Sequence, residues 1–107
     1  MSERPRVRVP KQARKGEIVE IKTLISHPME SGQRKNAAGQ PIPRKIINRF
    51  SCEFNGSPVF ACALETGIAA NPFLQFSARV GESGTFRFTW LDDDGTIITH
   101  KEKIAVI

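Results

Sequence analysis

Apolar and polar residues alternate in short stretches along most of the chain. Alternation with a period of two is typical of strands with one buried face, and these stretches end at Gly, Pro, Asn or Asp. No apolar stripe with the 3.6-residue period of a helix continues for three turns. The pattern therefore predicts an all-β protein. The expected strands cover residues 6–9, 17–26, 45–54, 59–64, 73–80, 85–91 and 96–106.

The alternation also assigns an inward face to each expected strand. Strand 17–26 is ambiguous, because Ile18, Val19, Ile21 and Leu24 compete for its inward face. In strand 45–54, Ile47 falls on the outward face. The inward positions of the later strands are Ile46, Asn48, Phe50, Cys52 and Phe54, then Phe60, Cys62 and Leu64, then Leu74, Phe76, Ala78 and Val80, and finally Phe86, Phe88 and Trp90.

Two registers are open for the hairpin around residues 54–60. A three-residue loop pairs Phe54 with Pro58 and sets Cys52 opposite Phe60, whereas a five-residue loop pairs Phe54 with Phe60 and sets Cys52 opposite Cys62. The two cysteines are neighbours in both registers. A disulfide between directly opposed strands is strained, so buried thiols that act as small hydrophobes are the expected state, with a disulfide as the alternative.

Seven short antiparallel strands separated by turns predict an immunoglobulin-like (E-set type) β-sandwich, with barrel closure as an alternative. The chain has no Tyr for a tyrosine corner, and its two Cys lie too close in sequence for the usual bridge between sheets. A length of 107 residues is enough for one domain. We expect this domain over residues 16–107, after a basic and partly disordered arm over residues 1–15.

The charge is uneven along the chain. Residues 1–53 carry 12 Lys or Arg and 5 Asp or Glu, whereas residues 54–107 carry 4 and 6. A basic half is compatible with nucleic acid, an anionic surface or an acidic protein. The basic arm has no interleaved aromatic residue to stack on a base, so we expect no nucleic-acid site. No apolar run approaches the roughly 18 residues of a membrane span, and no secretory signal peptide is expected.

The polar segment 30–44 contains two Gly and two Pro and is expected to be a long exposed loop. Connections longer than about 12 residues without structure of their own tend to be functional or disordered. His27, Pro28 and Met29 precede it and are expected to form a compact, semi-rigid tip at the end of a strand. This region is the leading candidate for contact with a partner.

No nucleophile, base and orienting acid fall into a recognisable catalytic pattern, so the sequence predicts a binding or scaffold module without a cofactor. His27 has no visible partner that would make it a general base. Asp92, Asp93, Asp94 and Gly95 are expected to form a hairpin turn, because the alternating donors and distant Glu of a calcium loop are missing. The alternative is a cupredoxin-like electron carrier that takes its copper ligands from His27, Met29, Cys52, Cys62 and His100.

Five stretches, in order along the chain, are similar to the SoxZ family of bacterial sulfur oxidation. They are IKTLISHPMESGQR, GQPIPRKIINRF, FNGSPVF, ANPFLQFSARV and SGTFRFTWLDDDG. The resemblance covers nearly the whole chain from Val19 onward, and residues 1–15 add nothing to it. It implies an immunoglobulin-like, non-catalytic subunit that forms a heterodimer with SoxY. The C-terminal arm of SoxY ends in a cysteine that carries the sulfur intermediates of thiosulfate oxidation.

The resemblance also implies a periplasmic protein without a leader of its own, exported as a folded complex on the twin-arginine signal of its partner. Other Sox enzymes are expected to meet it transiently through the complex. No family motif marks the surface that binds SoxY, so the long loop and its neighbours are the basis for the prediction. The expected interface residues are Ile25, His27, Pro28, Met29, Arg34, Pro43, Arg44, Ile47 and Arg49.

Overall fold

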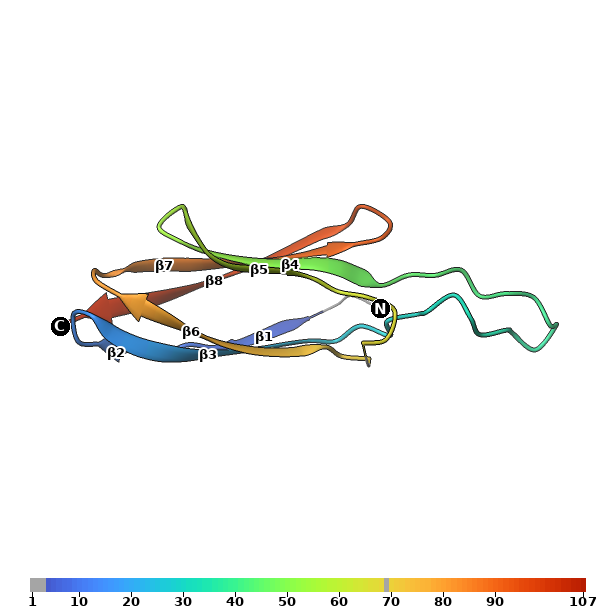
Figure 1. The fold of residues 1–107 in the computed structure, drawn as a ribbon, viewed down its shortest axis with the longest axis horizontal. Coiled ribbons are helices and arrows are strands. Elements are labelled where there is room, and N and C mark those ends of the chain that lie inside the picture. The colour runs from blue at the N-terminus through green and yellow to red at the C-terminus, as the bar shows by residue number, and fades with distance from the viewer. Residues whose placement is uncertain (1–3, 69) are drawn as a thin grey trace.

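The computed structural model describes residues 4–68 and 70–107 and consists of two packed β-sheets (Figure 1). A three-stranded sheet has the order β1-β3-β6, and a five-stranded sheet has the order β2-β8-β7-β4-β5. Their bounds are β1 Pro5–Arg8, β2 Gln12–Ala13, β3 Glu17–Ile25, β4 Ile47–Phe54, β5 Ser57–Ala63, β6 Phe73–Val80, β7 Gly84–Asp92 and β8 Ile97–Val106. The predicted immunoglobulin-like sandwich is confirmed, with two separate sheets in place of a closed barrel. No helix among the described residues is long and apolar enough to cross a membrane.

The core lies between the inward faces of the two sheets. Phe50, Phe86, Phe88 and Trp90 are its largest side chains, and at most 1% of each is exposed. The predicted inward faces of β6 and β7 are confirmed. In β3 the inward set is Val19, Ile21, Thr23 and Ile25. Ile18, which is 58% exposed, and Leu24 lie at outward positions, so the ambiguity of this strand is resolved in favour of Val19 and Ile21.

The start of β4 departs from strict alternation. Ile46 and Ile47 are consecutive, and neither has any exposed surface. The pairing of β4 with β7 shifts register between Ile47 and Arg49, and the extra residue of this bulge puts Ile47 on the same inward face as Phe50. The predicted outward position of Ile47 is therefore wrong, whereas Phe50 and Cys52 keep their inward positions.

A two-residue turn, Asn55-Gly56, joins β4 to β5. Its φ angles are +50° and +85°, as expected for a turn in which both central residues are left-handed. Phe54 pairs with Ser57, and a bulge after Cys52 then sets Cys52 opposite Phe60. Cys52 has the partner of the shorter predicted alternative, whereas the predicted pairing of Phe54 with Pro58 is wrong, because the turn has two residues and Phe54 pairs with Ser57. Both cysteines are free thiols.

The chain start joins the two sheets, where the sequence predicts a partly disordered arm with a short strand over residues 6–9. β1 pairs with β3 in the small sheet, and β2 pairs in parallel with β8 in the large one. Residues 5–13 therefore cross from one sheet to the other and close this side of the sandwich. The short β2 raises the number of strands from the expected seven to eight. Residues 1–3 of the expected arm lie outside the described residues.

The polar segment 30–44 forms a narrow extension beyond the sandwich (Figure 1). Isolated bridges join Glu30 to Lys45 and Lys35 to Pro41, so the segment folds back on itself like a hairpin. Its far end turns at residues 36–40, where the amide of Gln40 donates to the Asn36 side chain. The predicted exposure of this segment is confirmed, but the loop is partly paired. The molecule measures 59 Å along its longest axis and about 20 Å across.

Candidate functional site

His27 lies at the root of the extension and is fully buried. Its Nε2 is 2.7 Å from Oδ2 of Asp92, and neither side chain exposes more than 1% of its surface. Its Nδ1 accepts a hydrogen bond of 2.8 Å from the amide of Met29. Because an amide only donates, Nδ1 carries no proton and Nε2 donates to the carboxylate. Both ring nitrogens are engaged, so no lone pair is left for a general base.

The sequence shows no partner for His27, and the structure places the carboxylate of Asp92 beside it. Asp92 is 65 residues away along the chain, and no local spacing indicates the pair. Nζ of Lys45 donates to the same carboxylate over 2.8 Å. Burial favours a raised pKa for Asp92, but the hydrogen bonds from Lys45 and His27 outweigh it and keep this pKa below its ordinary value.

The next residue of the turn, Asp93, binds the segment that returns from the extension into β4. Its carboxylate accepts from the Asn48 side chain at 2.9 Å, from Nε of Arg44 at 2.9 Å and from the amide of Ile46 at 3.1 Å. The Asn48 hydrogen bond is the main reason that the pKa of Asp93 is lowered. The predicted hairpin turn is present, and its carboxylates also fix the position of the extension.

Met29 packs inside this root and does not form an exposed tip. It is 6% exposed, has a φ of +51°, and its sulfur accepts a 3.4 Å hydrogen bond from the amide of Ile47. Of the three residues in the expected tip, His27 and Met29 are buried and only Pro28 is exposed. The left-handed backbone of Met29 turns its side chain inward, and alternation along the sequence does not indicate this turn.

The nine predicted interface residues divide into two groups. Those buried within this chain are Ile25, His27, Met29 and Ile47. Those exposed are Pro28, Arg34, Pro43, Arg44 and Arg49. Only the exposed group is free to meet a partner without rearrangement, and the interface itself stays a prediction. Arg34 forms a bidentate ion pair with Glu30 on the extension, and this pair lowers the pKa of Glu30.

The residues proposed for a copper site do not converge. Cys52 and His100 both lie opposite Phe88, on either side of it, so β7 separates them. His27 contacts Asp92, four residues farther along β7, which corresponds to about 13 Å in a strand. Among residues 4–68 and 70–107, no three His, Cys, Asp or Glu side chains are grouped so that they could hold a metal. The cupredoxin-like alternative is therefore not supported.

Both cysteines are poorly placed for thiol chemistry. Burial, with a smaller contribution from Glu53, raises the pKa of Cys52 to about 12. Burial also raises the pKa of Cys62, against the opposing charge of Arg49. Because the thiolate is the nucleophile, neither side chain is suited to accept a sulfur group at neutral pH.

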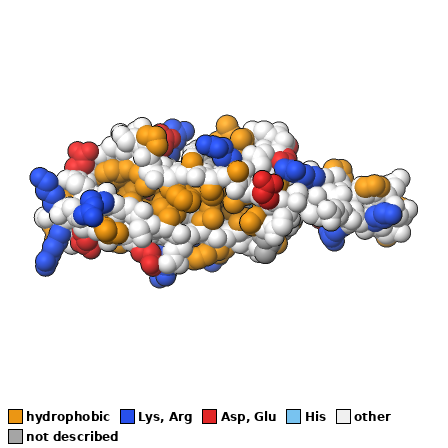
Figure 2. All heavy atoms as spheres, in the orientation of Figure 1, with side chains coloured by type: hydrophobic (Ala, Val, Ile, Leu, Met, Phe, Trp, Pro, Cys, Tyr) orange, Lys and Arg blue, Asp and Glu red, His pale blue; other side chains and the backbone are white. Residues whose placement is uncertain are grey.

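An apolar seam runs along the side of the sandwich opposite the chain start. β5 and β6 are the edge strands of their sheets there. Phe60 and Phe76 stack across the seam with ring centroids 4.7 Å apart, and Phe60 stays 37% exposed. Figure 2 shows apolar side chains gathered along the middle of this face, between the two strands. Unpaired edges beside exposed apolar surface are typical of a protein interface.

The family model for sulphur oxidation protein SoxZ matches residues 7–103. The chain belongs to the SoxZ family. The match begins within β1, so the similarity extends farther toward the chain start than the resemblance from Val19 onward. It includes the seam, the extension and the cluster around His27 and Asp92. No curated protein matches the sequence.

Solved structures share the sandwich of this SoxZ-family chain at low sequence identity. Superoxide reductase (neelaredoxin) from Ignicoccus hospitalis has a TM-score of 0.73 and 17% identity, covering 96% of this chain and 80% of that one. The sulfur carrier protein SoxY from Chlorobium limicola f thiosulfatophilum has a TM-score of 0.65 and 13% identity, covering 95% and 74%. A putative superoxide reductase from Thermotoga maritima has a TM-score of 0.64 and 15% identity, covering 96% and 85%. At these identities the likeness concerns the fold alone.

Proposed function

We propose that this sulfur-oxidation protein is a non-catalytic subunit that forms a heterodimer with a SoxY-like sulfur carrier. The match to the SoxZ family over residues 7–103 carries the proposal. In the complex, sulfur intermediates of thiosulfate oxidation are bound to the partner, and this chain holds the carrier and helps to present it to other Sox enzymes. The likeness to a SoxY structure supports a pairing of two similar sandwiches.

The state of the reactive side chains supports a non-catalytic role. The imidazole of His27 uses both nitrogens to hold the extension root. The thiol of Cys52 is buried, and its pKa of about 12 keeps it protonated. These groups stabilise the sandwich and its extension, which leaves the covalent chemistry to the partner.

The seam between β5 and β6 supports a stable partner. Phe60 exposes 37% of its surface there, beside two strand edges. An apolar surface of this kind is stabilised when a partner covers it. The extension contributes exposed cations and prolines beyond the sandwich, at Arg34 and Pro43. We place the heterodimer in the periplasm, where it arrives folded on a signal carried by its partner.

Co-expression tests the proposal directly. A SoxY-like protein from the same source carries an affinity tag, and the complex is measured by light scattering after gel filtration. We expect a 1:1 complex, and intact mass after thiosulfate turnover should show reductant-sensitive sulfur adducts on the SoxY-like chain only. Elution of the two chains as separate species, or sulfur adducts on Cys52 or Cys62, would contradict the proposal.

A further inference from the structure

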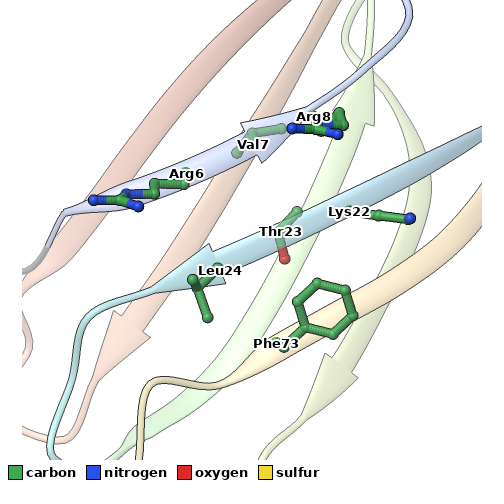
Figure 3. Close-up of a pocket in the computed structure, with 7 residues that line it drawn as sticks. All are labelled: Arg6, Val7, Arg8, Lys22, Thr23, Leu24 and Phe73. Carbon is green, nitrogen blue, oxygen red and sulfur yellow. The ribbon is translucent and has the colours of Figure 1, made fainter.

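A shallow groove crosses the outer face of the small sheet, away from the core (Figure 3). Its described lining comes from three neighbouring strands and contains no Asp or Glu. Arg6 and Arg8 lie on β1, Lys22 and Leu24 on β3, and Phe73 on β6. Neither the family match nor the proposed pairing with SoxY assigns a role to this surface.

The strand register arranges these side chains in two rows. Arg6 lies opposite Leu24, which in turn lies opposite Phe73, so one row runs from a cation to an aromatic ring. Arg8 lies directly opposite Lys22 in the next row. Rows on one face of a strand are about 7 Å apart, so three cations lie within a short distance of one another.

The cationic row is unfavourable in the isolated chain. Like charges directly opposite each other on a sheet repel, and Arg8 and Lys22 are such a pair. The ion pair of Lys22 with Glu20 is 3.5 Å long, and about half of each side chain is exposed. A pair this exposed offsets little of the repulsion. An anionic partner would therefore gain from contact with this row.

The aromatic end of the groove is exposed as well. Phe73 has 55% of its surface in solvent. In the register it lies opposite Leu24, and Arg6 follows on the next strand. Aromatic residues and arginines are both enriched in protein interfaces, and this groove offers an exposed ring and two arginines on one face. A small anion such as sulfate would contact the cations and leave Phe73 uncovered.

We propose that this groove docks an acidic segment of a protein partner. Its carboxylates pair with Arg6, Arg8 and Lys22, and an apolar side chain packs on Phe73 and Leu24. Charge complementarity supports this occupant, because the groove concentrates cations without a carboxylate in its described lining. The docking site goes beyond the proposed pairing with SoxY and does not depend on it.

A second cationic surface provides a matched control. Arg87, Lys101 and Lys103 line a hollow on the outer face of the large sheet, together with Glu53. Arg87 lies between Glu53 and Lys101 in the register, so a carboxylate already compensates part of this charge. The two surfaces carry the same number of cations. Only the groove beside Phe73 combines them with an exposed ring.

The test measures binding of a labelled acidic peptide, Glu-Asp-Glu-Phe-Glu-Asp-Glu, to the full chain by fluorescence anisotropy. We expect the R6E/R8E/K22E variant to weaken binding at least about tenfold, and the R87E/K101E/K103E variant to change it less than about threefold. A peptide with Ala in place of Phe should bind several-fold more weakly. Affinity should also fall as salt rises from about 0.05 to about 0.5 M.

Separate outcomes overturn the proposal. Equal losses in the two triple variants would mean a non-specific response to net charge. Displacement of the peptide by sulfate at low millimolar concentration, with no effect of Phe73→Ser, would mean a small-anion site. Circular dichroism establishes that each variant is folded, and R6A/R8A/K22A replaces the charge reversal if that variant does not fold. Loss of peptide binding in the complex with the SoxY-like subunit would contradict a separate docking site.

Discussion

His27 and Asp92 form a buried hydrogen-bonded pair, with Nε2 and Oδ2 2.7 Å apart, although 65 residues separate them in sequence. Lys45 binds the same carboxylate from the returning strand of the extension. Asp92 therefore ties both strands of the extension root to the turn between β7 and β8. The direction in which the extension leaves the sandwich depends on this carboxylate and on its neighbour Asp93.

Replacement of Asp92 by Asn should destabilise the protein strongly. The amide keeps the shape of the carboxylate but removes its charge, so the hydrogen bonds from His27 and Lys45 weaken. We expect the free energy of unfolding to fall by about 2–4 kcal/mol, measured by urea denaturation through Trp90 fluorescence. Asp94→Asn is the control, because its side chain is 47% exposed, and it should cost less than about 1 kcal/mol. Equal effects of the two substitutions would contradict the structural role of Asp92.

Acid should destabilise the protein through the same turn. The pKa values of Asp92 and Asp93 are lowered in the folded state, so the unfolded chain binds more protons as the pH falls. Their contribution is complete above the unfolded pKa of about 4 and is lost as the pH falls through the folded values. We expect the unfolding free energy to decline below about pH 4, and less steeply in Asp92→Asn. Parallel pH profiles of the two proteins would refute the assignment.

The two thiols should differ in reactivity. Cys52 is 1% exposed and its pKa is about 12, whereas Cys62 is partly exposed with a smaller rise in pKa. With iodoacetamide at about pH 8, native protein should take up one label slowly at Cys62 and almost none at Cys52. Peptide mapping by mass spectrometry identifies the site, and urea should expose both. Faster labelling of Cys52 than of Cys62 in native protein would count against the described packing.

The outer part of the extension should be dispensable for folding. The amide of Ile42 donates to the carbonyl of Arg34, so these residues already face each other across the extension. Residues 35–41 are replaced by Asn-Gly, a sequence suited to a two-residue hairpin turn. We expect the unfolding free energy to change by less than about 1 kcal/mol, because the removed side chains are exposed. Weaker binding to the SoxY-like subunit would add residues 35–41 to the interface, whereas unchanged binding would exclude them; the predicted interface residues Arg34 and Pro43 are kept in this variant.

The apolar seam should be required for pairing with the SoxY-like subunit. Phe60→Asp places a charge among apolar side chains that a partner would bury, so the 1:1 complex should weaken at least about tenfold. Ile97→Asp is the matched control, because Ile97 is 63% exposed at the start of β8, which is not an edge strand of the seam. Both variants are compared with the parent protein by gel filtration and circular dichroism. Similar retention of the complex by both variants would exclude the seam.

The alternation of apolar and polar residues was enough to predict the sandwich class and most of the core. Alternation in residues 73–80 and 85–91 placed Phe76, Phe86, Phe88 and Trp90 correctly, because a strand turns every second side chain to the same face. The same rule failed at Ile47, where a bulge in the pairing with β7 adds one residue and turns this side chain inward. A bulge depends on the partner strand, and a single strand sequence does not contain that information.

The candidate sites depend on contacts between segments that lie far apart in the chain. The partner of His27 is the carboxylate of Asp92, 65 residues away, and β2 pairs with β8 from the opposite end of the chain. Sequence patterns describe neighbours within a few residues, whereas these contacts depend on how the two sheets pack and on which strands are left at their edges. The groove of Arg6, Arg8 and Lys22 arises in the same way, because cross-strand register brings its two rows together.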